Sequence, residues 1–253
     1  MVRESVDAIE VRSLSKRFQL GRGNLGDLPV LNRVSFSVSK GEFVGIIGPN
    51  GCGKSTLLRI ILGLLPSDGG DVTVLGETPQ KARIGYVPQH ATGSLFPWFT
   101  SLENVAFAHT SNDSTRFELA KTKLNEFGLS QYADAYPYQL SGGTKQLVSL
   151  ARATSHSCVF LLDEPLNGLD YQNRFALEKR ILKMRNGENT VLLVSHDIES
   201  TVLLCDKILI LSSKPARIKA LLSVSLGENR SSKTRFEPEY ARILNQVYSL
   251  ISE

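Results

Sequence analysis

The sequence has few cysteines, and their spacing does not suit a structural role. Its 253 residues include only three, Cys52, Cys158 and Cys205. An odd, scattered set excludes the paired framework of a small disulfide-rich protein, and the spacing is not that of a zinc site. We therefore expect a reducing, intracellular compartment, which keeps thiols unpaired.

Long hydrophobic runs and a strong charge of either sign are also missing. No stretch approaches the ~18 uninterrupted apolar residues that a membrane-spanning helix needs. The N-terminus lacks the apolar core of a signal peptide because it carries the charged residues Arg3, Glu4, Asp7 and Glu10. The net charge of +4 is too small to indicate nucleic acid as a partner. We expect a chain that does not cross a membrane itself and has no nucleic-acid partner.

Short apolar segments alternate with helical patterns along the chain. Apolar runs rich in β-branched residues, or with period two, predict strands over 8–11, 34–38, 43–47, 72–75, 84–87, 159–162, 191–194 and 208–211. Helices are predicted over 55–63, over 238–251, and across 102–153 with interruptions at Gly128 and Pro137. The segment from Gly21 to Pro29 has the composition of a surface hairpin loop. This alternation favours a layered α/β fold around a mostly parallel sheet.

A phosphate-binding loop follows the predicted strand 43–47. Residues 48–55 match G-x-x-x-x-G-K-[ST], and they read Gly48, Pro49, Asn50, Gly51, Cys52, Gly53, Lys54 and Ser55. The glycines let backbone N–H groups approach an anion, and the next helix adds its positive end. We expect Lys54 to contact the β- and γ-phosphates of ATP, Ser55 to ligate Mg²⁺, and Thr56 to reach the α-phosphate. A chance glycine-rich turn is the alternative.

An acidic pair ends the predicted strand 159–162. Asp163 and Glu164 follow it directly, at the carboxyl edge of the sheet, where open α/β sheets bind ligands. Hydrolysis of a bound nucleotide needs a metal site and a group that orients or deprotonates water. Asp163 is predicted to hold Mg²⁺ and Glu164 to act as general base. A solvated acidic turn before Pro165 is the alternative interpretation.

Several further motifs resemble those of the ATP-binding cassette (ABC) ATPases, and they occur in the same order along the chain as in that family. Leu140-Ser141-Gly142-Gly143 resembles the family's signature segment, and it precedes the acidic strand. Single residues are similar to the family's adenine-stacking aromatic, Q-loop glutamine, D-loop aspartate and switch histidine, in that order: Phe18, Gln89, Asp170 and His196. The resemblance covers nearly the whole chain.

Each of these residues also has a simpler interpretation. Phe18 can be a core or edge aromatic, Gln89 a polar loop residue, and His196 a histidine with ordinary partners at a strand end. Ser141 can be a helix N-cap. That last interpretation is compatible with function, since the start of an N-capped helix is also an anion site.

The resemblance implies a fold and a mechanism. The fold is α/β, a P-loop NTPase core of ABC type with an antiparallel β subdomain and a helical subdomain. One ATPase domain would span 1–253, with the helical subdomain at about 90–155 and a C-terminal extension at about 212–253. ATP and Mg²⁺ are the implied cofactors, with Ser55, Gln89 and Asp163 at the metal. Lys54, Glu164 and His196 would be catalytic, and Ser141, Gly142 and Gly143 would bind the ATP of a second copy.

The resemblance also implies partners. A second ATPase subunit, most simply a homodimer, and transmembrane permease subunits would assemble at the cytoplasmic face of the inner membrane, with an extracytoplasmic solute-binding protein as an indirect partner. The run from Leu95 to Trp98 and the segment 214–218 resemble importers of nitrate, sulfonate and taurine. An exporter ATPase or a soluble non-transport ABC protein is the alternative. Departures from the family's pattern occur at Thr144, Leu147, Ser157 and 166–168.

Overall fold

The computed structural model describes residues 7–19, 26–89, 93–109 and 113–252. Its Cα packing divides the chain into two compact units, one formed by Met1–Ala82 with Asn186–Glu253 and the other by Arg83–Arg185. We call them unit 1 and unit 2 and describe each by itself.

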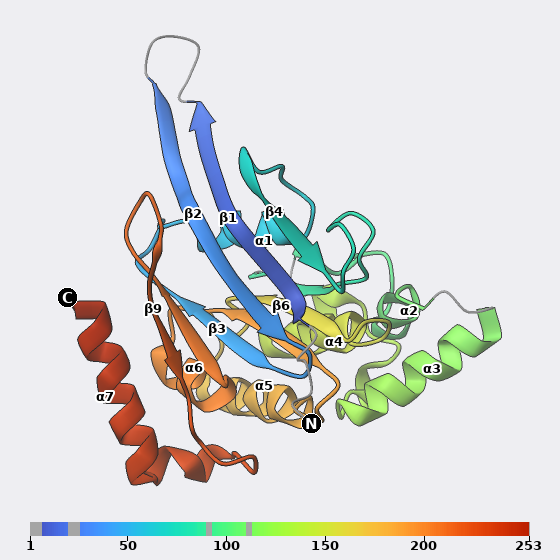
Figure 1. Cartoon of the computed structure of the whole chain (residues 1–253). Coiled ribbons are helices and arrows are strands. Elements are labelled where there is room, and N and C mark those ends of the chain that lie inside the picture. The colour runs from blue at the N-terminus through green and yellow to red at the C-terminus, as the bar shows by residue number, and fades with distance from the viewer. Residues whose placement is uncertain (1–6, 20–25, 90–92, 110–112, 253) are drawn as a thin grey trace, which may run out of the picture. The chain divides into compact units, whose positions relative to one another are not determined.

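Unit 1 contains a three-stranded antiparallel sheet in the order β2-β1-β4. Figure 1 shows β1 (Asp7–Gln19) and β2 (Asp27–Ser39) as a long hairpin, with β4 (Gly69–Val74) beside β1. Both hairpin strands are longer than predicted. β2 starts inside the predicted loop 21–29, of which residues 21–25 lie outside the described residues. The apolar alternation fails at bulges, where Ser13 and Arg33 have φ of 48° and 52°. The pattern therefore revealed only the regular part of each strand.

The second set of strands in unit 1 is mostly parallel and buried. β3 (Phe43–Ile47) lies between β7 (Thr190–Val194) and β8 (Lys207–Leu211), parallel to both, and all five residues of β3 are buried. β9 (Ile218–Ser223) adds an antiparallel edge to β8. The predicted strand 43–47 is confirmed. No strand was predicted at β9.

The described residues of unit 1 form the α-helices α1 (Lys54–Ile61), α6 (Ile198–Leu204) and α7 (Pro238–Ser252), with a 3₁₀ helix, η4 (Ser232–Phe236), before α7. α6 packs directly on β3, where a Cβ built at Gly45 would collide with the methyl group of Thr201 and lie 3.1 Å from Cys205 Sγ. α7 packs on α6 through a buried face that includes Tyr240, Ile243 and Val247. This is the amphipathic C-terminal helix predicted from the sequence.

Unit 2 pairs two short parallel strands, β5 (Gly85–Val87) and β6 (Val159–Asp163), with a group of helices. The helices are α2 (Ser101–Ala106), α3 (Asp113–Glu126), α4 (Gly142–Ala153) and α5 (Tyr171–Lys183), with short 3₁₀ turns η2 (Ser130–Tyr132) and η3 (Pro137–Gln139). The predicted interruptions are confirmed, since Gly128 has a φ of 69° after α3 and Pro137 opens η3.

None of the helices formed by the described residues has both the length and the apolar character that crossing a lipid bilayer requires.

Candidate functional site

The phosphate loop connects β3 to α1 in unit 1. Two of its glycines have left-handed backbones, with φ of 72° at Gly51 and 124° at Gly53, a conformation that glycine adopts without strain. A Cβ built at Gly53 would lie 2.9 Å from a methyl carbon of Val30 and 3.1 Å from one of Leu31. The loop therefore needs glycine for its path and for its fit under β2.

Lys54 is the most informative residue of this loop. Its side chain is only 7% exposed, and its ammonium group donates to the carbonyl oxygens of Gly48 at 2.8 Å and Pro49 at 3.2 Å. No carboxylate in the described part of the chain forms an ion pair with it. Because a buried charge is costly unless it is compensated, this cation is suited to an anionic ligand.

The start of α1 has the same electrostatic character. Its N-cap, Gly53, supplies no side-chain acceptor, and its first turn holds no acidic residue. The first N–H groups of a helix have no partner within the helix, and the positive end of the helix dipole adds to their attraction for anions. The residues present therefore fit a phosphate chain. Ser55 is exposed and Thr56 half-buried at this helix start, whereas Cys52 is 2% exposed.

Phe18 lies near the end of β1 and is 37% exposed. Its ring centroid is 5.6 Å from the ammonium group of Lys16, which also pairs with Asp68 at 2.8 Å. In the hairpin Phe18 lies opposite Leu28, two residues before Val30, which contacts the phosphate loop. The partly exposed ring of Phe18 is thus carried by β1, which pairs with the strand that contacts Gly53.

His196 lies between the end of β7 and the start of α6, with its side chain exposed. Asp197 caps α6, accepting hydrogen bonds from the Ser200 backbone N–H at 3.2 Å and the Ser200 hydroxyl at 2.7 Å. The N–H of Asp197 donates to the Ser195 hydroxyl at 2.9 Å. The backbone on both sides of His196 is therefore fixed by hydrogen bonds.

In unit 2, the acidic pair and the glutamine lie at the same edge of a parallel strand pair. Val87 is opposite Leu162 in the β5–β6 register, so Gln89 follows one strand as Asp163 and Glu164 end the other. Asp163 and Glu164 are 7% and 8% exposed, and Gln89 is half-buried. Glu164 has a φ of 50°, an uncommon backbone for a residue with a side chain. Such backbones are concentrated at functional sites.

The signature segment forms the start of α4. Ser141 is the N-cap, its hydroxyl accepting from the Thr144 N–H at 3.2 Å and lying 2.8 Å from the Thr144 hydroxyl. Gly142 is exposed. A Cβ built at Gly143 would collide with the side chain of Asn173 in α5. The N-cap interpretation of Ser141 is thus confirmed, and this helix start also has no acid in its first turn.

Asp170 caps the next helix, α5. Its carboxylate accepts from the backbone N–H of Asn173 at 2.9 Å and from the Asn173 side-chain amide at 2.6 Å. These two hydrogen bonds, the backbone one first, hold the pKa of Asp170 below its ordinary value. Asn173 therefore contacts both the aspartate and the signature helix. Asn173 was not predicted as a site residue from the sequence, although its place three residues after a capping aspartate is a usable signal.

The predicted site residues fall into two groups, one in each unit. Unit 1 holds Phe18, the loop from Gly48 to Thr56, and His196; unit 2 holds Gln89, the segment from Ser141 to Gly143, the acidic pair, and Asp170. A polar hollow of about 1220 Å³ in unit 1 lies elsewhere, lined by side chains that include Arg17, Arg33 and Arg217. The candidate nucleotide site is therefore identified by the buried cation and uncapped helix start of the phosphate loop, and not by the presence of a surface hollow.

Comparison with known proteins agrees with this chemistry. The family described as ABC transporter matches residues 31–167, more than half of the chain. The nitrate import ATP-binding protein NrtD of Synechocystis sp. is 34% identical, with 96% of this chain and 94% of the relative covered. The taurine import ATP-binding protein TauB of Roseobacter denitrificans is 32% identical, with 97% and 96% covered.

A solved structure shares the fold. The ATP-binding cassette MJ0796, in a dimeric post-hydrolysis state bound to ADP and Pi, superposes with a TM-score of 0.75 at 27% identity, covering 87% of this chain and all of that one. The chain belongs to the ABC transporter family. It is the ATP-binding, ATP-hydrolysing type of component in that family, as predicted from its motifs.

Proposed function

We propose that this protein powers a membrane importer of a small solute of the nitrate, taurine or sulfonate kind, by binding and hydrolysing ATP. Relatives that align along nearly the whole chain are named as import ATP-binding proteins for nitrate, taurine and aliphatic sulfonates. In this proposal the whole chain, 1–253, forms one ATPase domain, with a helical subdomain at about 90–155 and a C-terminal extension at about 212–253.

The observation that carries the proposal is the buried ammonium group of Lys54 beside the uncapped start of α1. Lys54 and the backbone N–H groups of residues 48–56 hold the phosphates, and the Phe18 ring stacks on the base. The oxygen donors of Ser55, Asp163 and Gln89 suit Mg²⁺, which prefers hydroxyl, carboxylate and carbonyl ligands. When bound, the ion neutralises charge that develops on the phosphates.

Three further residues act on the attacking water, the γ-phosphate and the metal site. Glu164 accepts the proton of this water as general base, a role that its position beside the metal-binding Asp163 supports. His196 contacts the γ-phosphate and reports its presence. Gln89 connects the metal site to the helical subdomain.

A second copy of the chain completes each site. The helix start at Ser141, Gly142 and Gly143 offers a second set of N–H groups with no acidic residue in its first turn, and the similar cassette of known structure is dimeric. We propose a homodimer in which this segment binds the γ-phosphate held by the partner copy, while Asp170 lies at the same interface. ATP then stabilises the dimer, and hydrolysis releases it.

A membrane permease is the proposed second partner, and an aromatic cluster in unit 2 supports it. The rings of Phe96, Trp98, Phe99 and Phe107 pack together at centroid distances of 4.7 to 6.2 Å. Trp98 is nonetheless 67% exposed and Phe107 59% exposed. Exposed aromatic groups of this kind mark protein interfaces. The protein would thus lie at the cytoplasmic face of the inner membrane, with a solute-binding protein acting from the other side.

The substitution Glu164→Gln tests the ATPase assignment. It removes the base but keeps the shape, so we expect an ATP-bound dimer that does not turn over, measured by light scattering and phosphate release. The double variant Glu164→Gln/Lys54→Ala should stay monomeric, because it cannot hold the phosphates. A monomeric Glu164→Gln protein in saturating ATP would contradict the proposal.

The permease assignment needs its own measurement. Trp98→Ala should abolish co-purification of permease subunits from detergent-solubilised native membranes while leaving ATP binding intact. Phe236→Ala is the matched control, since Phe236 is an 89% exposed aromatic residue of unit 1. Equal co-purification of the two variants would contradict this docking surface.

A further inference from the structure

Helix α6 begins two residues after His196, and the segment that follows β9 holds this helix at both ends. The first contact is at its N-terminal turn. The hydroxyl of Tyr240, in α7, donates to the backbone carbonyl oxygen of Glu199 at 2.9 Å. Tyr240 is 4% exposed, so the hydrogen bond is shielded from water.

The Tyr240 hydroxyl is a permanent donor. Burial is the largest cause of a raised pKa, and the charges of Glu199 and Asp197 act in the same direction. Arg235 opposes them through its charge and a hydrogen bond to the Tyr240 hydroxyl, and the net effect raises the pKa of Tyr240 to about 12. The phenol therefore stays protonated at every physiological pH. Ile243 and Val247, 1% and 0% exposed, continue the contact face of α7.

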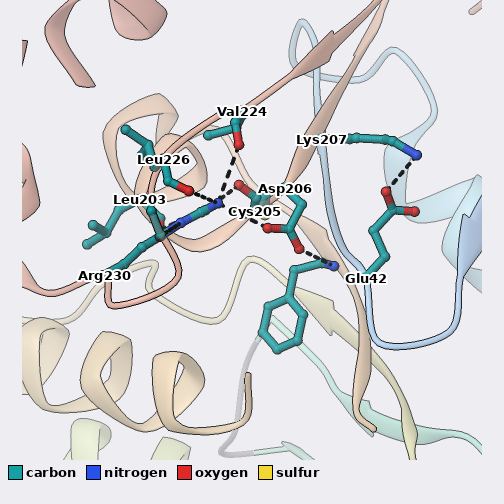
Figure 2. Close-up of polar contacts among 10 residues, drawn as sticks. Glu42, Leu203, Cys205, Asp206, Lys207, Val224, Leu226 and Arg230 are labelled. Atoms are coloured by element: carbon teal, nitrogen blue, oxygen red, sulfur yellow. Dashed lines mark hydrogen bonds and ion pairs between the residues drawn. The ribbon is translucent and has the colours of Figure 1, made fainter. Parts of the chain in front are cut away.

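The second contact is at the C-terminal end of α6, and Figure 2 shows it. The guanidinium group of Arg230 donates to the carbonyl oxygen of Cys205 at 2.6 Å and to that of Leu203 at 3.4 Å. The last carbonyls of a helix have no partner within the helix. Arg230, whose side chain is 2% exposed, therefore acts as a buried C-terminal cap.

Arg230 also connects α6 to the strand that leads into the phosphate loop. It forms an ion pair with Asp206 at 3.0 Å. The other carboxylate oxygen of Asp206 accepts from the backbone N–H of Phe43, the first residue of β3, at 3.0 Å. α6 itself contacts the middle of β3 at Gly45, with no room for a side chain between them. Hydrogen bonds through Arg230 and Asp206, together with the packing of α6 on Gly45, thus link α6, β3 and the C-terminal segment.

We propose that Tyr240 and Arg230 are positioning residues for His196: the C-terminal segment 224–252 fixes α6, and through the cap at Asp197 it fixes the histidine relative to the phosphate loop. The inference rests on the proposed role of His196 in sensing the γ-phosphate. It assigns a catalytic purpose to the C-terminal extension, which lies outside the nucleotide-binding motifs.

Tyr240→Phe tests this with a single lost hydroxyl group. We expect kcat for ATP to fall about three- to tenfold with KM within about twofold, the effect of losing the hydroxyl's hydrogen bonds where they matter only in the transition state. Tyr248→Phe is the matched control on the same helix, because Tyr248 is 44% exposed; its kinetics should equal those of wild type. Arg230→Lys should reduce kcat less than Arg230→Met, since lysine keeps the charge opposite Asp206.

A spectroscopic measurement separates positioning from general loss of stability. The chain has four histidines, so the ring signal of His196 can be assigned by NMR from its loss in His196→Ala. Tyr240→Phe should move this signal and leave that of His109, in unit 2, unchanged. An unmoved His196 signal, an unchanged kcat, or parallel changes in kcat, KM and thermal stability would each overturn the inference. A His196→Ala variant with wild-type kcat would instead overturn the proposed role of His196, and the NMR result would still decide whether Tyr240 positions the ring.

Discussion

Gly143 and Asn173 are in such close contact that the space between α4 and α5 admits no side chain at position 143. Asn173 in turn donates two hydrogen bonds to Asp170. Within unit 2, the signature helix and the aspartate that precedes α5 are therefore positioned by one shared residue. A change at Gly143 should reach Asp170 through Asn173.

The two glycines of the signature should respond in opposite ways to alanine. Gly143→Ala forces Asn173 or the start of α4 to move, and overpacking of this kind costs about 1–3 kcal/mol of unfolding free energy. Gly142 has open space around its Cα, so Gly142→Ala should be neutral or stabilise by up to about 1 kcal/mol, because alanine loses less entropy in a helix. Urea unfolding of the nucleotide-free protein measures both. Equal destabilisation by the two variants would show that the contact with Asn173 is unimportant.

Asp170 should make stability depend on acid pH. Its pKa in the folded protein lies below the ordinary value of 3.8, so its contribution is fully present above the unfolded-state pKa and is lost as the pH falls through the folded-state pKa. Asp170→Asn keeps an N-cap acceptor but cannot titrate. The stability gap between wild type and this variant should therefore be larger at pH 6 than at pH 2.5. Urea unfolding at the two pH values measures it, and a gap that does not change with pH would contradict the prediction.

Lys54→Met should separate folding from nucleotide binding. The variant loses two hydrogen bonds to backbone carbonyls but also removes a buried charge, so the unfolding free energy without ATP should change by no more than about 1 kcal/mol. ATP at one hundred times its Kd stabilises wild type by about 2.7 kcal/mol and should barely stabilise the variant. Thermal unfolding with and without ATP measures this, and Lys40→Met, at an exposed lysine, should keep the full ATP effect. Full stabilisation of Lys54→Met by ATP would contradict the proposed phosphate contact.

The sequence predicted best those elements whose residues are buried on both faces. The run 43–47 is apolar throughout and is β3 with those same bounds. The hairpin was predicted only in part, since Ser13 and Arg33 interrupt its alternation with left-handed backbones. In the site, the capping role of Ser141 could be predicted from the sequence, because an N-cap bonds to residues that are only two or three positions further along the chain. The contact of Gly143 with Asn173 could not, because it depends on how α4 packs on α5.

The contact between Gly45 and α6 gives a prediction about packing, together with its rescue. Gly45→Ala places a methyl group against the Thr201 methyl and near Cys205 Sγ, and we expect a loss of about 1–3 kcal/mol. Thr201→Ser removes the colliding methyl but keeps the hydroxyl, which donates to the carbonyl oxygen of Asp197 at 2.7 Å. On its own, Thr201→Ser should cost about 0.5–1.5 kcal/mol, as the loss of one buried methyl group does.

The double variant Gly45→Ala/Thr201→Ser should be more stable than the sum of the two single changes predicts. Residues in direct contact show coupling energies of about 0.5–3 kcal/mol, whereas distant residues add independently. A urea-unfolding cycle over the four proteins measures the coupling, and simple additivity would show that α6 can move away from β3. Because α6 follows His196, the same cycle on kcat should show the double variant regaining activity along with stability.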